Sequence, residues 1–223
     1  MKTRKKRKFK RRYFLLADLL IVIVLFVLLL YKPARYDPLA PADNKQVSSY
    51  LTHELMTQLY NGAQRNEPFD LVVMQEGIND VVTRAKWPIE SGGTMFYAPA
   101  VLFTADSIVL MGTAAVKGVE FIVTIVIEPK LDEKGLLNLQ VTKVKVGAMN
   151  ITLLARMVAK KMYQQRLATT EVDTDDLGAQ IAASLLSDEP FEPVFTVEDK
   201  KVRAEKITIT QGKVTLSLVP APG

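Results

Sequence analysis

Cysteine is absent from the 223 residues, and histidine occurs once, at position 53. Without cysteine there are no disulfide bonds, thiol nucleophiles or cysteine metal ligands, so packing alone must stabilise the fold. A histidine-based catalytic triad would have to use His53, yet no G-x-S-x-G motif is present and His53 falls in a simple amphipathic helical pattern. The P-loop and G-x-G-x-x-G motifs are also missing, which excludes the usual phosphate-binding loops. We therefore expect no enzyme, no cofactor and no metal.

Two groups of acidic residues resemble sites but have simpler explanations. Glu76 and Asp80 stand four residues apart, as paired catalytic carboxylates can, but a solvated helix face accounts for them better. Asp173 and Asp175 match the first two ligand positions of a calcium loop, whereas Leu177 stands where the third oxygen ligand is needed. Capping of the following helix explains these last acids.

Basic residues are concentrated at the N-terminus rather than spread over the chain. Residues 1–12 hold nine of the 29 Lys and Arg and no acid, which leaves 20 basic and 24 acidic residues elsewhere, a net charge of −4. A nucleic-acid surface needs cations across a folded face, so we expect no nucleic-acid partner. Residues 1–12 are predicted to be a basic cytoplasmic tail that sets membrane topology, with binding to anionic lipids as a second interpretation.

One long apolar run follows this tail. Residues 13–31, YFLLADLLIVIVLFVLLLY, would extend as a helix at about 1.5 Å per residue, close to the roughly 30 Å thickness of the hydrocarbon layer. The nine cations before the run, against Lys32 and Arg35 after it, predict a cytoplasmic N-terminus. We therefore predict a single-pass signal anchor in a bacterial-type inner (plasma) membrane with an extracytoplasmic C-terminal domain.

Two features of this segment leave alternatives open. Ala40-Pro41-Ala42 matches a signal-peptidase pattern, but it stands about ten residues beyond the apolar run, so a retained anchor is favoured over a cleaved signal peptide. Asp18 lies inside the run, where it is expected either near the headgroups beside the basic tail or paired with a cation on another helix.

The exported part is predicted to be a proline-containing tether, 32–42, followed by one α+β domain, 43–220. The domain begins with a helix capped by Asp43 or Asn44 and ended by Gly62, and continues with a short valine-rich strand and a second helix that Pro88 limits. Four strand-like runs then form an antiparallel meander. They cover 95–104, 107–116, 119–128 and 136–146.

Two more helices and a hairpin complete the predicted domain. The helices span about 150–166 and 174–186, and the hairpin turns at Gln211-Gly212, which sets Ile209 opposite Val214. We expect this hairpin to complete the sheet of the meander. The single tryptophan, Trp87, is expected at the edge of the core or at the membrane interface.

One predicted strand of the meander is apolar on both faces. In residues 120–128, EFIVTIVIE, both alternating sets of side chains are largely apolar, so each face needs cover from helices, a second sheet or a bound apolar molecule. In the next strand the apolar parity changes near Thr142 and Lys143, which predicts a bulge there.

The stretch 119–154, VEFIVTIVIEPKLDEKGLLNLQVTKVKVGAMNITLL, has Pro129, Gly135 and Gly147 at its corners. Together with the order of the parts and a helix opening QEGIN, it resembles the YpmS-like bacterial single-pass envelope proteins of unassigned function. These in turn are similar to tubular lipid-binding domains, in which a long helix packs in the hollow of a strongly curved antiparallel sheet. The resemblance covers about 120 residues, and this chain is longer than that family in 160–193.

The two-sided apolar strand and the resemblance together predict a non-catalytic, membrane-anchored domain that binds an apolar ligand such as a lipid or an acyl chain. The alternative is a scaffold or accessory subunit of a cell-envelope complex with no small ligand. Expected partners are membrane lipids and an envelope protein, with the oligomeric state open. The predicted ligand-binding residues are Ile125, Ile127, Leu139, Val141, Leu154 and Val158.

Overall fold

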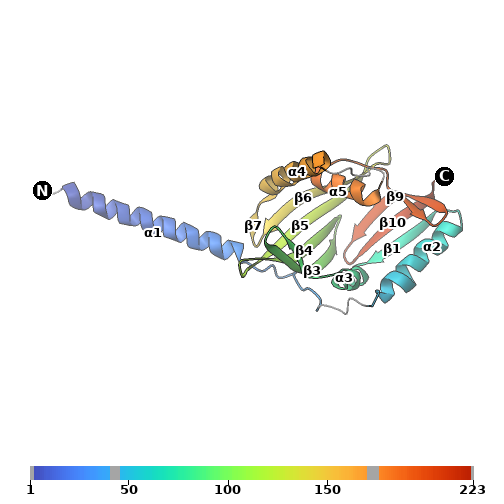
Figure 1. Cartoon of the computed structure of the whole chain (residues 1–223), viewed down its shortest axis with the longest axis horizontal. Helices are drawn as coiled ribbons and strands as arrows, with labels where there is room; N and C mark the ends of the chain where they lie inside the picture. The colour runs from blue at the N-terminus through green and yellow to red at the C-terminus, as the bar shows by residue number, and fades with distance from the viewer. Residues whose placement is uncertain (1–2, 41–45, 170–175, 222–223) are drawn as a thin grey trace.

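Two antiparallel sheets with helices packed against them form the domain (Figure 1), which confirms the predicted α+β class. The computed structural model describes residues 3–40, 46–169 and 176–221, and the side chains of 3–12 and 166–169 lie outside that description. The helices are α1 (Thr3–Leu29), the short π-helical segment η1 (Tyr50–Leu55), α2 (Met56–Gln64), α3 (Gln75–Thr83), α4 (Thr152–Thr169) and α5 (Leu177–Ser187).

The meander forms a six-stranded sheet in the order β2-β3-β4-β5-β6-β7. The predicted bulge is confirmed, because Val126 is opposite Lys143 and Ile127 is opposite Val141, which leaves Thr142 as the extra residue. The strands are β2 (Ile89–Ser91), β3 (Thr94–Thr104), β4 (Ser107–Val116), β5 (Val119–Leu131), β6 (Leu137–Val146) and β7 (Met149–Asn150).

The C-terminal hairpin belongs to a second sheet, so the expectation that it would complete the meander is wrong. Its register is as predicted, with Ile209 opposite Val214, but the hairpin pairs with the early valine-rich strand rather than with the meander. This sheet has the order β1-β10-β9-β8. Its strands are β1 (Phe69–Met74), β8 (Val194–Val197), β9 (Lys200–Thr210) and β10 (Lys213–Pro220).

The two sheets meet through the hairpin. Ile209 and Val214 pack with Val101 and Phe103 in one apolar cluster, and the Gly212 N–H donates to the Phe103 carbonyl at 3.1 Å. This packing buries the apolar side chains of both the hairpin and the meander. It explains why the hairpin does not extend the edge of the meander, since pairing at that edge would leave these side chains in water.

Side chains of α3 hydrogen-bond the backbone along the edge of β3, in the part of that strand that does not pair with β2. The Asn79 side-chain amide bonds both the N–H and the carbonyl of Val101 at 2.8 Å, and Gln75 Oε1 accepts from the Phe103 N–H at 2.8 Å. These bonds give an open strand edge the partners that it would otherwise need from another chain.

The first helical segment starts later and ends later than predicted, covering η1 and α2. The proposed caps Asp43 and Asn44 lie outside the described residues. Gly62 lies inside α2 rather than ending it. A Cβ at this position would overlap the Phe69 ring. The glycine is thus explained by close packing rather than by a turn.

The segment predicted to be a plain tether is anchored to the sheet at Tyr36, whose exposed fraction is 5%. Its hydroxyl donates to the Ala98 carbonyl at 2.6 Å and lies 2.8 Å from Thr113 Oγ1. Tyr36 packs with Ala100 and Met111 on the face of the meander opposite the second sheet. Residues 32–42 are therefore more than the predicted tether, because Tyr36 belongs to the packed fold.

Helix α1 projects from one end of the domain (Figure 1). Where the structure describes the chain, no helix combines the length and apolar character needed to cross a membrane. The end of α1 is held by the turn between β6 and β7, where the Ala148 N–H donates to the Leu28 carbonyl at 2.8 Å. Gly147 permits this approach, because a Cβ there would overlap the carbonyl oxygens of Leu28 and Leu29.

We expect Tyr36→Phe to lower the free energy of unfolding by about 1–3 kcal/mol, since it removes the hydroxyl that bonds a partly buried carbonyl and a buried threonine hydroxyl. The measurement is urea unfolding of the full chain in detergent, followed by the fluorescence of the single tryptophan. Tyr60→Phe, at a tyrosine that is 42% exposed, is the control and should change stability by less than about 0.5 kcal/mol. Equal effects of the two variants would contradict the anchoring role of Tyr36.

We expect Gly147→Ala to release the end of α1 from the β6–β7 turn. Pulsed EPR between spin labels at Val22→Cys and Glu133→Cys should give a broader distance distribution in this variant. Gly118→Ala is the matched control, because both glycines have positive φ, +58° and +81°, but Gly118 has nothing within 4 Å of its Cβ position. Both substitutions cost about 1 kcal/mol of backbone strain, so only the clash distinguishes them. An unchanged distribution in Gly147→Ala would contradict the contact.

Candidate functional site

Helices α4 and α5 are attached to β6 by hydrogen bonds that fix their positions over the sheet. Thr152 Oγ1 accepts from the Val144 N–H at 2.9 Å at the start of α4, and Arg156 donates to the Val141 carbonyl at 2.5 Å. The fully buried Ser184 of α5 accepts from the Leu139 N–H at 2.8 Å. These bonds fix the two helices at a set distance from β6. The size of the space between the helices and the sheet therefore depends largely on the side chains that point into that space.

A cavity of about 330 Å³ lies between the sheet and these two helices. This volume is at the lower end of the roughly 300–1,000 Å³ that is typical of small-molecule sites. Apolar side chains form most of its wall, with cations and one acid at its rim. The lining residues are Leu110, Ile125, Ile127, Val141, Val144, Ala155, Arg156, Ala159, Lys160, Leu185, Leu186, Ser187 and Asp188.

Half of the predicted ligand-binding residues line this cavity. Ile125, Ile127 and Val141 do so, on the face of the sheet that the alternating pattern indicated. Leu139 is not part of the wall. Leu154 and Val158 lie on the outer surface of α4, with exposed fractions of 56% and 49%, so their assignment to the cavity is wrong.

The error arises from the orientation of α4. The helix turns Ala155 and Ala159 towards the sheet, together with Arg156 and Lys160, and leaves its larger apolar side chains outside. Small residues allow close approach to the strands, and the long cationic side chains can place apolar stems at the cavity while their charged ends reach water. A prediction that the most apolar stripe of a helix faces the core therefore fails here.

Two further strand residues line the cavity beside Ile125, Ile127 and Val141 and were not predicted. Leu110 and Val144 are the cross-strand partners of Ile125, so they share its face of the sheet. Extending the alternation from one strand to its pairing partners would have identified both residues. The contribution of α5, through Leu185 and Leu186, was not foreseen because the position of that helix depends on tertiary contacts.

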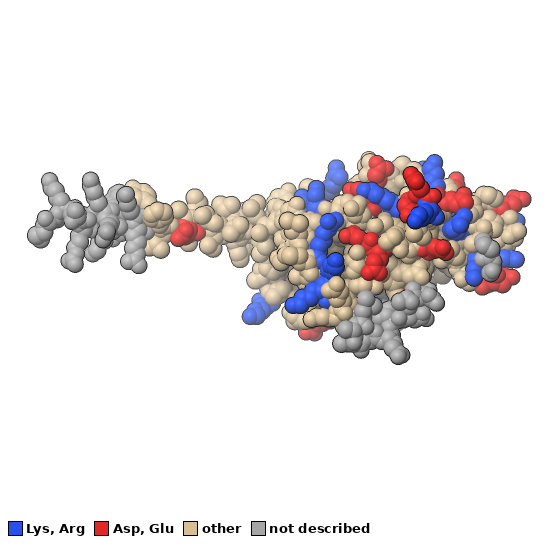
Figure 2. Space-filling model, turned by 90° about the horizontal axis from the view of Figure 1, so that it is seen from above, with Lys and Arg blue, Asp and Glu red and all other residues tan. Residues whose placement is uncertain are grey.

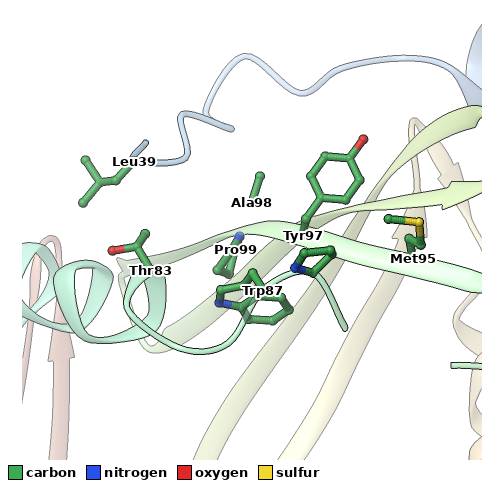
Figure 3. A pocket seen from close by; sticks show the side chains of 8 residues that line it. Leu39, Thr83, Trp87, Met95, Tyr97, Ala98 and Pro99 are labelled. Carbon is green, nitrogen blue, oxygen red and sulfur yellow. The ribbon is translucent and has the colours of Figure 1, made fainter. Parts of the chain in front are cut away.

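A second apolar pocket, of about 300 Å³, lies on another part of the domain (Figure 3). Trp87 and Pro88 contribute from the segment after α3, and Leu39 contributes from the N-terminal segment that crosses this face. The Trp87 indole N–H donates to the Val82 carbonyl at 2.7 Å, so the ring is fixed in the wall. The remaining lining residues are Thr83, Met95, Tyr97, Ala98 and Pro99.

Tyr97 and Tyr163 both have raised pKa values. A hydrogen bond to the Glu120 carboxylate raises the pKa of Tyr97 to about 12, because the carboxylate stabilises the protonated phenol. Burial raises the pKa of Tyr163 on α4, and the negative charge of Glu189 adds to that effect. Both hydroxyls therefore stay neutral near neutral pH and supply no base.

The acidic residues considered as a carboxylate pair also have structural roles. Asp80 accepts a hydrogen bond from Arg84 at 2.9 Å and another from Ser48 at 2.5 Å, and these bonds lower its pKa. Asp80 thus joins α3 to Ser48, just before η1, while 32% of its side chain stays exposed, and Glu76 is exposed, as the pattern suggested. Asp176 caps α5 by accepting from the Ala179 N–H at 3.0 Å, whereas Asp173 and Asp175 lie outside the described residues.

Among the side chains that the structure describes, no three His, Asp or Glu residues lie close enough together to hold a metal ion. His53 lies exposed on η1. The arrangement over β5 and β6 is an apolar cavity whose charged lining residues are Arg156, Lys160 and Asp188.

No protein-family model, curated protein or solved structure matches the chain. The resemblance to the YpmS-like proteins and to tubular lipid-binding domains thus stays a prediction.

Proposed function

We propose that this protein is a non-catalytic, membrane-anchored domain that holds an apolar ligand, such as the acyl chain of a lipid, between its six-stranded sheet and helices α4 and α5. The single observation that carries the proposal is the apolar cavity of about 330 Å³, walled by Ile125, Ile127 and Val141 on one side and by α4 and α5 on the other. A cavity of this size fits one chain or a small apolar molecule rather than a whole diacyl lipid.

The rim of the cavity supports a ligand with one polar end. Arg156, Lys160 and Asp188 are the charged residues among those that line the cavity, and all three are exposed. Cations beside an apolar wall suit an amphipathic molecule with an anionic head, because the tail is taken out of water while the head keeps a charged partner. A fatty acid or a phospholipid chain has this character.

Membrane anchoring by α1 is the second part of the proposal. Apolar side chains from Tyr13 to Leu28 along this helix are about 40–70% exposed and form a long uncovered apolar surface. Exposing such a surface to water is costly, at roughly 25 cal/mol per Å². The nine cations in residues 1–12 favour a cytoplasmic N-terminus and an extracytoplasmic domain.

A scaffold or accessory subunit of an envelope complex is the competing proposal. The observation in its favour is the exposed apolar face of α4, where Leu153 is 80% exposed and Met157 is 66% exposed. A partner protein could cover such a face. The two proposals differ in whether the cavity contains a ligand.

The ligand proposal is tested by extracting the purified domain, residues 32–223, with organic solvent and identifying the extract by mass spectrometry. This boundary keeps Tyr36, which belongs to the fold, and omits α1, which would carry lipid non-specifically. We expect about one lipid or fatty acid per chain. Ala159→Phe should fill the cavity and reduce the bound amount by about tenfold or more, the effect of losing about 1.4 kcal/mol of binding.

Gln164→Phe, on the exposed side of the same helix, is the matched control and should retain the ligand. Failure to recover any stoichiometric apolar molecule from the unmodified domain would exclude the ligand proposal and favour the scaffold.

The anchor proposal is tested by fusing alkaline phosphatase, which is active only outside the cytoplasm, to Gly223 of the full chain. We expect high phosphatase activity in the membrane fraction, because the positive charge of residues 1–12 holds the N-terminus inside. Replacing these nine cations by glutamine should lower the activity. An inactive fusion, or one recovered with the soluble proteins at full length, would exclude the anchor.

A further inference from the structure

Helix α4 exposes a compact apolar patch on its first two turns. The patch consists of Leu153, Leu154, Met157 and Val158, which are 80%, 56%, 66% and 49% exposed. The outer side of the following turns is mixed, with Lys161 and Gln164 exposed beside Met162, which is 63% exposed. Four of the five large apolar side chains of α4 that the structure shows exposed thus lie in the N-terminal half of the helix.

This half of α4 lies next to the point where α1 joins the domain. Ala148, whose N–H bonds the Leu28 carbonyl, precedes the first residue of α4 by only four positions. Figure 1 shows α4 beginning near β7, on the side of the domain from which α1 emerges. The patch is therefore placed close to the end of the proposed membrane anchor.

Other exposed apolar residues occupy the same end of the six-stranded sheet. The Gly147 N–H donates to the Ile122 carbonyl at 2.8 Å, so the end of α1 lies close to the start of β5 and hence to the β4–β5 turn. We call these residues and the α4 patch together the basal surface. It comprises Met95, Phe96, Val116, Val119, Leu153, Leu154, Met157 and Val158.

Positive charge accompanies the basal surface. The α4 sequence contains two Arg and two Lys and no acid, although residues 13–223 as a whole carry a net charge of −4. Figure 2 shows uncharged side chains around the base of α1 and Lys and Arg side chains just beyond them. An apolar patch bordered by cations is the pattern of a surface that rests on an anionic bilayer.

We propose that the basal surface lies on the outer leaflet of the membrane that α1 enters, with the first two turns of α4 inserted among the headgroups. The proposal rests on the anchor proposed above, and the occupant is a lipid bilayer rather than a second copy of the chain. The fixed junction at Ala148 supports this choice, because it holds the patch beside the helix that would enter the bilayer. Arg156 and Lys160 then bring the rim of the cavity to the lipid surface.

The test uses the full chain, whose lack of cysteine allows single labels to be placed without removing native residues. Leu154→Cys and Met157→Cys are each labelled with the fluorophore NBD and reconstituted into vesicles of phosphatidylcholine and phosphatidylglycerol at 3:1. Lipids carrying a doxyl quencher near the headgroup report contact of the labels on α4 and β8–β9 with the bilayer, and lipids carrying it deep in the acyl chain report the label at 22 within α1. Asp199→Cys, in the exposed turn between β8 and β9 at the opposite end of the domain, is the negative control, and Val22→Cys within α1 reports the anchor.

We expect the labels at 154 and 157 to lose about half of their fluorescence or more, since an interfacial helix is immersed about 5–10 Å. The label at 199 should keep its fluorescence. Adding Met157→Glu to the labelled Leu154→Cys chain should restore the fluorescence, because a charge in the patch opposes its insertion. Adding Gln164→Glu to the same chain should leave the quenching unchanged. This difference would show that the patch, and not the label, drives the insertion.

Quenching at 22 without quenching at 154 and 157 would overturn this inference and leave the anchor intact. A blue-shifted emission at 154 and 157 that the doxyl lipids do not quench would overturn it in favour of a protein partner. Absence of quenching at 22 would overturn the anchor and this inference together.

Discussion

The contact between the end of α1 and the β6–β7 turn is the interaction on which the functional account depends. The Ala148 N–H donates a hydrogen bond to the Leu28 carbonyl. Gly147 allows the two segments to approach this closely, because a Cβ at its position would overlap the end of α1. The terminal carbonyls of a helix lack their usual partners four residues on, and the Leu28 carbonyl accepts from Ala148 at 2.8 Å as well as from the Tyr31 N–H at 3.4 Å. The same contact ties an apolar helix to a rigid strand pair, and so fixes which end of the domain faces the proposed membrane.

The second organising constraint is the two-sided apolar character of β5. One face of its sheet is covered by the second sheet, α3, α4 and α5, and the other is covered partly by Tyr36 and its surroundings. Cover by α4 is incomplete because this helix places alanines over the strands, and the cavity is the space that remains. The larger apolar residues of α4 are thereby left for an external surface. A single helix orientation thus accounts for the cavity and for the basal surface.

Local patterns predicted those parts of the fold that depend on neighbours in sequence. The strands of the meander, the bulge at Thr142 and the hairpin register at Ile209 and Val214 all follow from alternation and turn residues. The pairing of the hairpin with β1 could not be predicted, because it joins segments about 140 residues apart and nothing local distinguishes the two sheets.

The candidate site was predicted only in part for the same physical reason. The strand residues Ile125, Ile127 and Val141 follow from period-two alternation once a covered face is assumed. The helix residues do not, because an amphipathic helix normally turns its apolar stripe inward, and α4 does the reverse. Tyr36 was missed because a lone aromatic between prolines carries no periodic signal, and its burial depends on the carbonyl of Ala98 and the hydroxyl of Thr113.

The central claim is that α1 lies in the bilayer with its end attached to the β6–β7 turn. Hydrogen–deuterium exchange of the full chain in lipid nanodiscs tests this claim most directly. The account predicts that the amides of residues 13–29 and of Ala148 exchange far more slowly in nanodiscs than in a chaotropic detergent solution that unfolds the domain, because lipid excludes water from the helix. Rapid exchange throughout residues 13–29 in nanodiscs, with the strands of the domain still protected, would contradict it.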